Sequence, residues 1–219
     1  MYGASSNNIP EVYLEKANEF GKKLAEFGHV LVYGGGNSGV MGAAAKGVLE
    51  KSGTVIGIAP HFFKERKQLL DRCTYFFYTE TMRERKQMME DKSDAFVMMP
   101  GGIGTFEEFF EILTLKQLSR HNKPIIVVNI NGYFQPLLDL LKKATDENFL
   151  YEGNLRLFSV CNSVKGDEFD DRNRQHPQYV DDDVHAQRHV HGSLRFPVWL
   201  ALLHIRVIRS GCNCSMLPY

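Results

Sequence analysis

The feature that most constrains this sequence is the alternation, over its first 165 residues, of short apolar runs with longer segments of helical periodicity. Alternation of this kind is typical of a parallel sheet that carries helices on both faces. The sequence therefore predicts an α/β fold with a parallel sheet between two layers of helices. The apolar runs that predict strands lie at residues 29–36, 54–60, 73–79, 94–100 and 123–130.

The segments between these runs carry apolar residues at the spacing of an amphipathic helix. The first such helix begins after Pro10, a residue favoured at the start of helices, and ends at Gly28. A helix rich in small residues then ends at Gly53, whereas the charged residues 62–72 predict either a short helix or a mobile segment. Three further helices are predicted over residues 81–93, 106–120 and 133–148.

The two ends of the sequence depart from this regular pattern. Residues 1–6 are predicted to be the loop that follows a strand, with that first strand missing upstream. Residues 166–193 lose all apolar periodicity and are dense in charge and histidine, which predicts disorder or a solvated tail. We therefore expect one folded domain over residues 1–165 and an atypical, poorly packed tail over residues 166–219.

The overall charge and the cysteines exclude several classes of protein. Lysine plus arginine equals aspartate plus glutamate at 26 residues each, so no global charge attracts nucleic acid or a membrane surface. The start lacks the basic and then apolar segments of a signal peptide, and the apolar stretch 194–208 is too short and too charged to span a bilayer. Of the four cysteines only Cys212 and Cys214 are close in sequence, which predicts no disulfide framework and a reducing, cytoplasmic environment.

Three glycine-containing loops follow predicted strands, at the sheet edge where ligands bind in open α/β folds. Residues 3–6 offer backbone donors and two hydroxyl groups, and residues 34–39 carry glycines at G-x-G-x-x-G spacing. Such spacing usually indicates a dinucleotide, but the next strand ends in Ala59 and Pro60, without the acid that would bind a ribose. Tight packing of a helix on a strand is the alternative interpretation of this second loop.

The third loop gives the strongest signal for a phosphate. Its backbone amides would form a concave group of donors at the N-terminus of the following helix, with a threonine hydroxyl added. A loop that only packs needs fewer glycines, and we therefore expect one phosphate-binding site here. The residues that predict it stand directly after an apolar run: Gly101, Gly102, Gly104 and Thr105.

Acidic and basic residues flank this third loop. Glu107 and Glu111 lie one turn apart on the predicted helix, where the helix dipole favours acids but like charges at this spacing repel each other. An arginine between them, such as Arg85 from the preceding helix, would remove the repulsion. A solvated basic face is the alternative interpretation of that helix. A carboxylate and an arginine beside a phosphate suit cleavage at the anomeric carbon of a phosphorylated sugar.

Two motifs carry a resemblance to a known family, namely residues 100–108, PGGIGTFEE, and residues 82–86, MRERK. Together with residues 3–6 and 33–42, which occur in the same order, they resemble the LOG family of cytokinin riboside 5′-monophosphate phosphoribohydrolases. The resemblance covers residues 1–164 and implies a modified Rossmann-like, nucleotide-binding catalytic domain. It also implies a homodimer with its active site near the subunit interface, and no nucleic-acid or membrane partner.

The resemblance further implies hydrolysis of the N-glycosidic bond of a cytokinin-type or purine nucleoside 5′-monophosphate, with no cofactor and no metal. By position it implies Arg85 and Glu108 as the catalytic pair. Glu108 would stabilise an oxocarbenium-like state or orient water, and Arg85 would hold the ribose or its phosphate. The resemblance and the glycine loops together predict contacts with the substrate from Lys86, Gly101, Gly102, Ile103, Gly104, Thr105, Glu107, Thr114, Gly35, Gly36 and Ser5.

Two other hypotheses stay open at the level of the sequence. A non-catalytic carrier of a nucleotide or cofactor on the same fold would use the same glycine loops, as the related molybdenum-cofactor carriers do, but has no evident use for Glu108. An inactive, truncated product whose ends prevent folding is the third hypothesis. The accepted base is left open, because residues 61–72 or a partner subunit would contact it. The histidines of the tail are not expected to form a metal site: His176, His185, His189 and His191.

Overall fold

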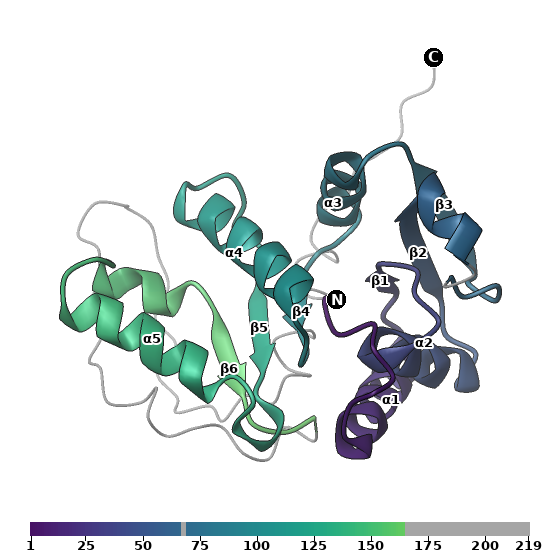
Figure 1. Ribbon diagram of the computed structural model, residues 1–219, viewed down its shortest axis with the longest axis horizontal. Coiled ribbons are helices and arrows are strands. Elements are labelled where there is room, and N and C mark those ends of the chain that lie inside the picture. Colours follow the sequence, from purple (N-terminus) through teal and green to yellow (C-terminus); the bar gives the residue numbers. More distant parts are fainter. Residues whose placement is uncertain (67–68, 165–219) are drawn as a thin grey trace, which may run out of the picture.

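The alternating pattern folds as parallel strands joined by helices in a computed structural model, which describes residues 1–66 and 69–164 (Figure 1). The predicted α/β class is therefore confirmed. The helices are α1 (Glu11–Glu26), α2 (Gly39–Glu50), α3 (Met82–Asp91), α4 (Ile103–Gln117) and α5 (Gln135–Asp146). The strands are β1 (Leu31–Tyr33), β2 (Val55–Pro60), β3 (Tyr75–Thr79), β4 (Phe96–Met98), β5 (Ile125–Val128) and β6 (Ser159–Cys161). Short 3-10 helices cover His61–Arg66, Ile130–Gly132 and Glu152–Arg156.

The strands form two three-stranded sheets, with the orders β1-β2-β3 and β4-β5-β6, and every pair of strands is parallel. Leu31 of β1 is in register with Val55 of β2, and Phe96 of β4 is in register with Ile125 of β5. Because all strands run the same way, their carboxyl ends lie along one edge of each sheet, which is where ligand sites form.

Residues 1–3 lie between the two sheets and connect them, as the position of the N-terminus in Figure 1 shows. The amino group of Met1 donates a hydrogen bond to the carbonyl oxygen of Val32 in β1 at 2.7 Å. The N–H of Tyr2 donates to the carbonyl oxygen of Val97 in β4 at 2.9 Å. Residues 1–3 therefore occupy the carboxyl-terminal end of the place where the sequence predicts a first strand.

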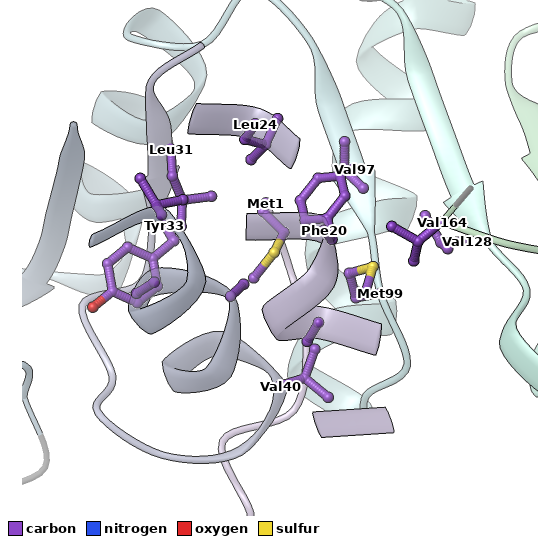
Figure 2. Close-up of a cluster of buried hydrophobic side chains, with 14 of the residues drawn as sticks. Met1, Phe20, Leu24, Leu31, Tyr33, Val40, Val97, Met99, Val128 and Val164 are labelled. Carbon is purple, nitrogen blue, oxygen red and sulfur yellow. The ribbon is translucent and has the colours of Figure 1, made fainter. Parts of the chain in front are cut away.

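Successive residues of the strands alternate between two hydrophobic clusters, one on each face of the sheets. Leu31 packs in the cluster that contains side chains of α1 and α2, whereas Val32 packs in the cluster that contains side chains of α3, α4 and α5. Figure 2 shows the first of these clusters, in which Met1 lies near Phe20 of α1 and Val97 of β4. Burial on both faces explains why the strands read as continuous apolar runs.

The structure differs from the sequence prediction at two points. Helix α4 begins at Ile103 and not at residue 106, because the N–H of Phe106 donates to the carbonyl of Gly102 and closes a first turn around the glycines. Strand β6 was not predicted, and it pairs with β5 so that Ser159 is in register with Ile126. The earlier start of α4 matters for function, because it makes residues 103–105 part of the helix.

The predicted tail with its histidines lies outside the described residues, so the division into residues 1–165 and 166–219 stays a prediction. Among the described helices, none is both long enough and apolar enough to cross a membrane. In the same part of the chain, Cys73 and Cys161 are free thiols.

Candidate active site

Three loops meet at the carboxyl ends of the strands, where the sequence places its glycines. The N–H of Ala4 donates to the carbonyl oxygen of Pro100 at 3.0 Å, and the N–H of Met41 donates to the carbonyl oxygen of Ala4 at 3.1 Å. The hydroxyl of Ser38 donates to the carbonyl oxygen of Ser5 at 2.7 Å. These bonds hold the three predicted ligand loops side by side at one edge of the fold.

The first turn of α4 presents backbone N–H groups that have no acceptor within the helix. The first helical hydrogen bond runs from the N–H of Phe106 to the carbonyl of Gly102 at 3.0 Å, so the amides of residues 102–105 precede it. A side chain at Gly102 or Gly104 would meet no heavy atom within 4 Å, which shows that the space around this turn is open. Donors that face open space at a helix N-terminus can bind an anion such as phosphate.

Gly101 fixes the approach of the chain to that turn. A Cβ added at Gly101 would collide with the hydroxyl of Thr105 and with the backbone nitrogen of Ala4, so this position has no room for a side chain. The carbonyl oxygen of Gly101 accepts a hydrogen bond from the hydroxyl of Tyr133 at 2.7 Å. No motif in the sequence indicates Tyr133, which lies 32 residues further along the chain.

Replacing Gly101 with alanine is expected to destabilise the fold, because the new Cβ has to displace Thr105 or Ala4. Overpacking of this kind lowers the free energy of unfolding by about 1–3 kcal/mol. The matched variant Gly104→Ala places its Cβ in open space inside a helix, where alanine is expected to raise the free energy of unfolding by roughly 0.5–1 kcal/mol. Urea denaturation of the two variants checks the contrast, and equal effects would contradict it.

A buried ion pair between Arg85 of α3 and Glu108 of α4 lies beside these loops. The Nη1 atom of Arg85 is 2.7 Å from Oε1 of Glu108, and the two side chains are only 8% and 10% exposed. The Nε atom of Arg85 donates to the carbonyl oxygen of Ile58 in β2 at 3.2 Å. A Cβ added at Gly34 would collide with the guanidinium, so the glycine loop after β1 packs directly against it. The structure thus brings together the two residues that the sequence predicts as a catalytic pair.

The start of α3 explains why Arg85 points inward. Thr81 caps the helix by accepting a hydrogen bond from the N–H of Glu84 at 3.1 Å, and Glu84 accepts one in return from the N–H of Glu80. With the helix fixed at this residue, Arg85 and Met89 lie one turn apart and are both buried. The alternative interpretation of α3 as a solvated basic face therefore does not hold for Arg85, which lies inside the protein.

Burial raises the pKa of the Glu108 carboxyl above its ordinary value, and the neighbouring Arg85 guanidinium opposes this effect. Arginine stays protonated in proteins, so it holds a compensating positive charge beside the carboxylate. Glu108 is therefore a buried acid whose orientation is fixed by one cation. Shifted pKa values of this kind occur often at functional sites.

The acids on the outer face of α4 are paired by a lysine and not by an arginine. Lys86 makes ion pairs with both Glu107 and Glu111, at 2.9 Å to Oε2 of Glu111. The expectation that Arg85 would separate these two acids was wrong, because Arg85 faces the interior while the next residue of α3 faces α4. Burial lowers the pKa of Lys86, but the hydrogen bonds with Glu107 and Glu111 outweigh it and raise that pKa.

The other residues that the sequence predicts to contact the substrate differ in how exposed they are and in what holds them. Ser5 and Thr114 are exposed, and Thr114 lies two turns beyond Glu107 along α4. The carbonyl oxygen of Gly35 accepts a hydrogen bond from the N–H of Leu70 at 2.9 Å, so the second loop is held partly by the chain after β2. The contacts of these residues with a substrate stay predictions.

The arrangement combines anion-binding amides with a buried carboxylate that a cation holds in place. Glu108 follows Gly104 by one helical turn, a rise of about 6 Å, which is the scale of a ribose between a phosphate and its anomeric carbon. Within residues 1–66 and 69–164, no group of three or more histidine, cysteine, aspartate or glutamate side chains lies together as metal ligands would. Chemistry at a phosphorylated sugar fits this set of groups.

Comparison with known proteins supports the same interpretation. Residues 41–166 match the family model described as "Possible lysine decarboxylase". A cytokinin riboside 5′-monophosphate phosphoribohydrolase from Rhodococcoides fascians is 37% identical over 155 residues, which cover 70% of this chain and 78% of that protein. A protein of the same name from Mycobacterium tuberculosis is 36% identical over 165 residues, covering 75% and 88% respectively.

A likeness to a solved structure extends the comparison to three dimensions. The molybdenum cofactor carrier protein from Chlamydomonas reinhardtii has a TM-score of 0.55 and 27% identity, covering 74% of this chain and 88% of that one. The same fold therefore serves proteins whose names describe a carrier and proteins whose names describe a hydrolase.

Proposed function

This chain belongs to the LOG family, and we propose that it hydrolyses the N-glycosidic bond of a cytokinin-type or purine nucleoside 5′-monophosphate to give the free base and ribose 5-phosphate. The observation that carries the proposal is the buried Arg85–Glu108 pair, one helical turn from a group of open backbone amides. Phosphate binding at the amides would place the sugar against the carboxylate, with no cofactor required.

Each part of the site has a role in this reaction. The amides of residues 102–105 bind the 5′-phosphate, and Lys86 neutralises part of the charge of Glu107 and Glu111, which would otherwise repel that phosphate. Glu108 stabilises the positive charge that develops at the anomeric carbon, or orients the attacking water. Arg85 is engaged by Glu108 and by the carbonyl of Ile58, so it acts here by positioning the carboxylate more than by holding the phosphate.

The direct test is an assay of product release. The full chain is incubated with AMP and, separately, with an N6-substituted AMP, and ribose 5-phosphate is measured over time. Release from either nucleotide supports the proposal, and the ratio of the two values of kcat/KM identifies the preferred base. Absence of ribose 5-phosphate with both nucleotides, for a protein shown to be folded by circular dichroism, would refute it.

The dependence of the reaction on pH follows from the burial of Glu108. The carboxylate has to be ionised to stabilise positive charge, so kcat/KM is expected to fall as the pH drops through the pKa of Glu108. Because burial raises this pKa, the acidic limb is expected above the ordinary glutamate value of 4.5. A profile of kcat/KM between roughly pH 4 and pH 8 measures it, and a limb at or below the ordinary value would contradict this role.

A homodimer in the cytoplasm is part of the same proposal. Helix α4 and the residue that caps its C-terminus expose Ile103, Phe110 and Leu118, and neighbouring large exposed apolar side chains suit a subunit interface. The free thiols of Cys73 and Cys161 suit a reducing compartment. Sedimentation equilibrium of the purified chain tests the dimer.

A carrier function is the second candidate, because the solved carrier from Chlamydomonas reinhardtii shares the fold. An anion carrier would use the amides of α4 but has no evident use for a buried carboxylate beside them. The pair of Arg85 and Glu108 therefore favours catalysis. Tight binding of a nucleotide that is recovered intact would instead favour the carrier.

A decarboxylase that uses pyridoxal phosphate does not fit the lysine at this site. Such a cofactor needs a lysine amine that can lose its proton and form a Schiff base. Lys86 is held between Glu107 and Glu111, and these acids raise its pKa despite burial, which favours the protonated ammonium. The family description "Possible lysine decarboxylase" therefore finds no support in the chemistry of Lys86.

A further inference from the structure

The peptide unit between Gly101 and Gly102 is the least restrained part of the anion-binding turn. Neither residue carries a Cβ, so the backbone on both sides of this unit has the freedom of glycine. A Cβ added at Gly102 would meet no heavy atom within 4 Å, so the surroundings do not restrain it either. In a trans peptide such as this one, the C=O and N–H groups point in opposite directions. Rotation of this unit would therefore turn the carbonyl oxygen of Gly101 toward a bound phosphate, which it would repel.

The hydroxyl of Tyr133 holds this peptide unit in one orientation. It donates to the carbonyl oxygen of Gly101 at 2.7 Å, the usual distance of a well-formed O–H···O hydrogen bond. The bond keeps the Gly101 oxygen on the side of Tyr133 and therefore the N–H of Gly102 on the opposite side. A bulkier residue at position 101 could not restrict the backbone instead, because Thr105 and Ala4 leave no room for a Cβ. The hydrogen bond thus supplies the restraint that the two glycines lack.

The ring of Tyr133 is itself held by two other aromatic rings. The ring of Phe134 packs edge-on against it, with centroids 4.9 Å apart and an interplanar angle of 87°. The ring of Tyr13 in α1 packs in a similar way from 5.7 Å, at 72°. Phe134 is only 1% exposed and belongs to the hydrophobic core, and edge-to-face contacts of this kind are favourable. The Tyr133 hydroxyl is therefore a donor on a fixed support.

A tight turn after β5 carries Tyr133 to this place. Asn131 and Gly132 have φ angles of 53° and 70°, in the left-handed region where glycine and asparagine are favoured. The buried side chain of Asn129 accepts a hydrogen bond from the N–H of Phe134 at 2.7 Å. The turn is thus closed by a side chain at the carboxyl end of β5, on both sides of Tyr133.

We infer that Tyr133 is a positioning residue for the 5′-phosphate, an inference that rests on the function proposed above. It keeps the Gly101–Gly102 peptide in the orientation in which the N–H of Gly102 can donate to the phosphate. Because Tyr133 acts through the peptide and not on the sugar, its hydroxyl governs affinity and not the chemical step at Glu108. A ligand that binds one of two orientations loses affinity in proportion to the fraction of protein in the other.

The test is the variant Tyr133→Phe, which keeps the ring contacts and removes only the hydroxyl. The Kd of ribose 5-phosphate, measured by isothermal titration calorimetry, is expected to rise about 5-fold, the equivalent of one hydrogen bond. The KM of the preferred nucleotide is expected to rise by a similar factor. The value of kcat is expected to stay within about 2-fold, because saturating nucleotide selects the competent orientation. Circular dichroism checks that the variant is folded and melts close to the parent.

A matched control removes a hydroxyl from the same aromatic group. Tyr13→Phe changes the ring that packs on Tyr133 but leaves the bond to Gly101 in place, so it is expected to bind ribose 5-phosphate as the parent does. Equal losses of affinity in the two variants would overturn the inference in favour of general packing. A Tyr133→Phe protein with the affinity of the parent would overturn it as well. So would a fall in kcat larger than the rise in KM, which would place Tyr133 in the chemical step.

The binding measurement separates this inference from the proposed hydrolysis. A parent chain that binds ribose 5-phosphate but does not release it from nucleotides would refute the hydrolysis, and the contrast between the two variants would still decide the role of Tyr133. Release of ribose 5-phosphate by the parent with no loss of affinity in Tyr133→Phe would refute only the role of Tyr133. A parent chain that binds no ribose 5-phosphate would overturn the anion site and the role of Tyr133 together.

Discussion

Replacing Glu108 with glutamine is expected to lower kcat for release of ribose 5-phosphate by at least ~100-fold, the usual contribution of a positioned acid or base. Glutamine keeps the size of the side chain but removes the negative charge that faces the developing positive charge. Binding of the nucleotide depends on the amides of residues 102–105 and is expected to change much less. The measurement is single-turnover hydrolysis at saturating nucleotide, with the affinity for ribose 5-phosphate measured in parallel.

A matched control comes from the same helix. Glu111 is one turn from Glu108 and shares the cation Lys86 with Glu107, so Glu111→Gln leaves Lys86 with one partner. Its effect on kcat is expected to stay below ~10-fold, because a partly exposed ion pair such as Lys86–Glu111 is worth only about 0–1 kcal/mol. A Glu108→Gln protein that is folded, binds ribose 5-phosphate and retains normal turnover would refute the catalytic assignment. Equal losses in both variants would indicate a general electrostatic effect instead.

The fold was largely predictable, because its strands are buried on both faces and its helices have strong periodicity. The strand predicted from Thr54 onward (β2) and the helix predicted after Pro10 (α1) appear in the structure close to their predicted limits. The boundary of α4 was not predictable from periodicity, since glycines are poor helix formers and Gly104 is helical only because the first turn closes on Gly102. Strand β6 is three residues long and paired on one side, which leaves a weak pattern.

The arrangement of the candidate site was predictable where a motif fixed both residue type and local geometry, and not where partners come from distant segments. The resemblance pointed to Arg85 and Glu108, and the structure places them 2.7 Å apart. The pairing of cations with acids depends on the rotation of α3 about its own axis relative to α4. The sequence pattern does not fix this rotation, and the pairing of Lys86 with Glu107 and Glu111 was therefore not predicted. Tyr133 supports the glycine loop from a third segment, and no local signal indicates it.

Replacing Arg85 with alanine is expected to have the largest effect on stability, a loss of about 3–5 kcal/mol in the free energy of unfolding. The reason is that Glu108 would be left as a buried carboxylate without its cation, and the carbonyl of Ile58 without its donor. For a domain of this size such a loss lowers the melting temperature by roughly 6–20 °C. Differential scanning calorimetry measures it, and a loss below about 1 kcal/mol would show that water replaces the guanidinium at little cost.

The pH dependence of this loss identifies its cause. In the Arg85→Ala protein the pKa of Glu108 rises further, because the guanidinium that opposed the effect of burial is gone. A pKa that is higher in the folded state means that folding favours the protonated, neutral form of Glu108 over its carboxylate. Folding is therefore penalised as the pH rises from the ordinary glutamate value through the raised one. The stability of the variant is thus expected to approach that of the parent at acidic pH and to fall behind it toward neutral pH.

The double variant Arg85→Met/Glu108→Gln separates the buried charge from the lost packing. It replaces the guanidinium by an apolar chain and removes the acid at the same time, so no uncompensated charge stays buried. Replacing both members of a buried ion pair by groups of similar volume is often neutral or stabilising, unlike the loss of one member. We therefore expect the double variant to recover most of the stability lost in Arg85→Ala and to lose the dependence on pH, while its turnover stays as low as that of Glu108→Gln. Stability regained without activity would mean that the protein retains this buried ion pair for its chemistry and not for its folding.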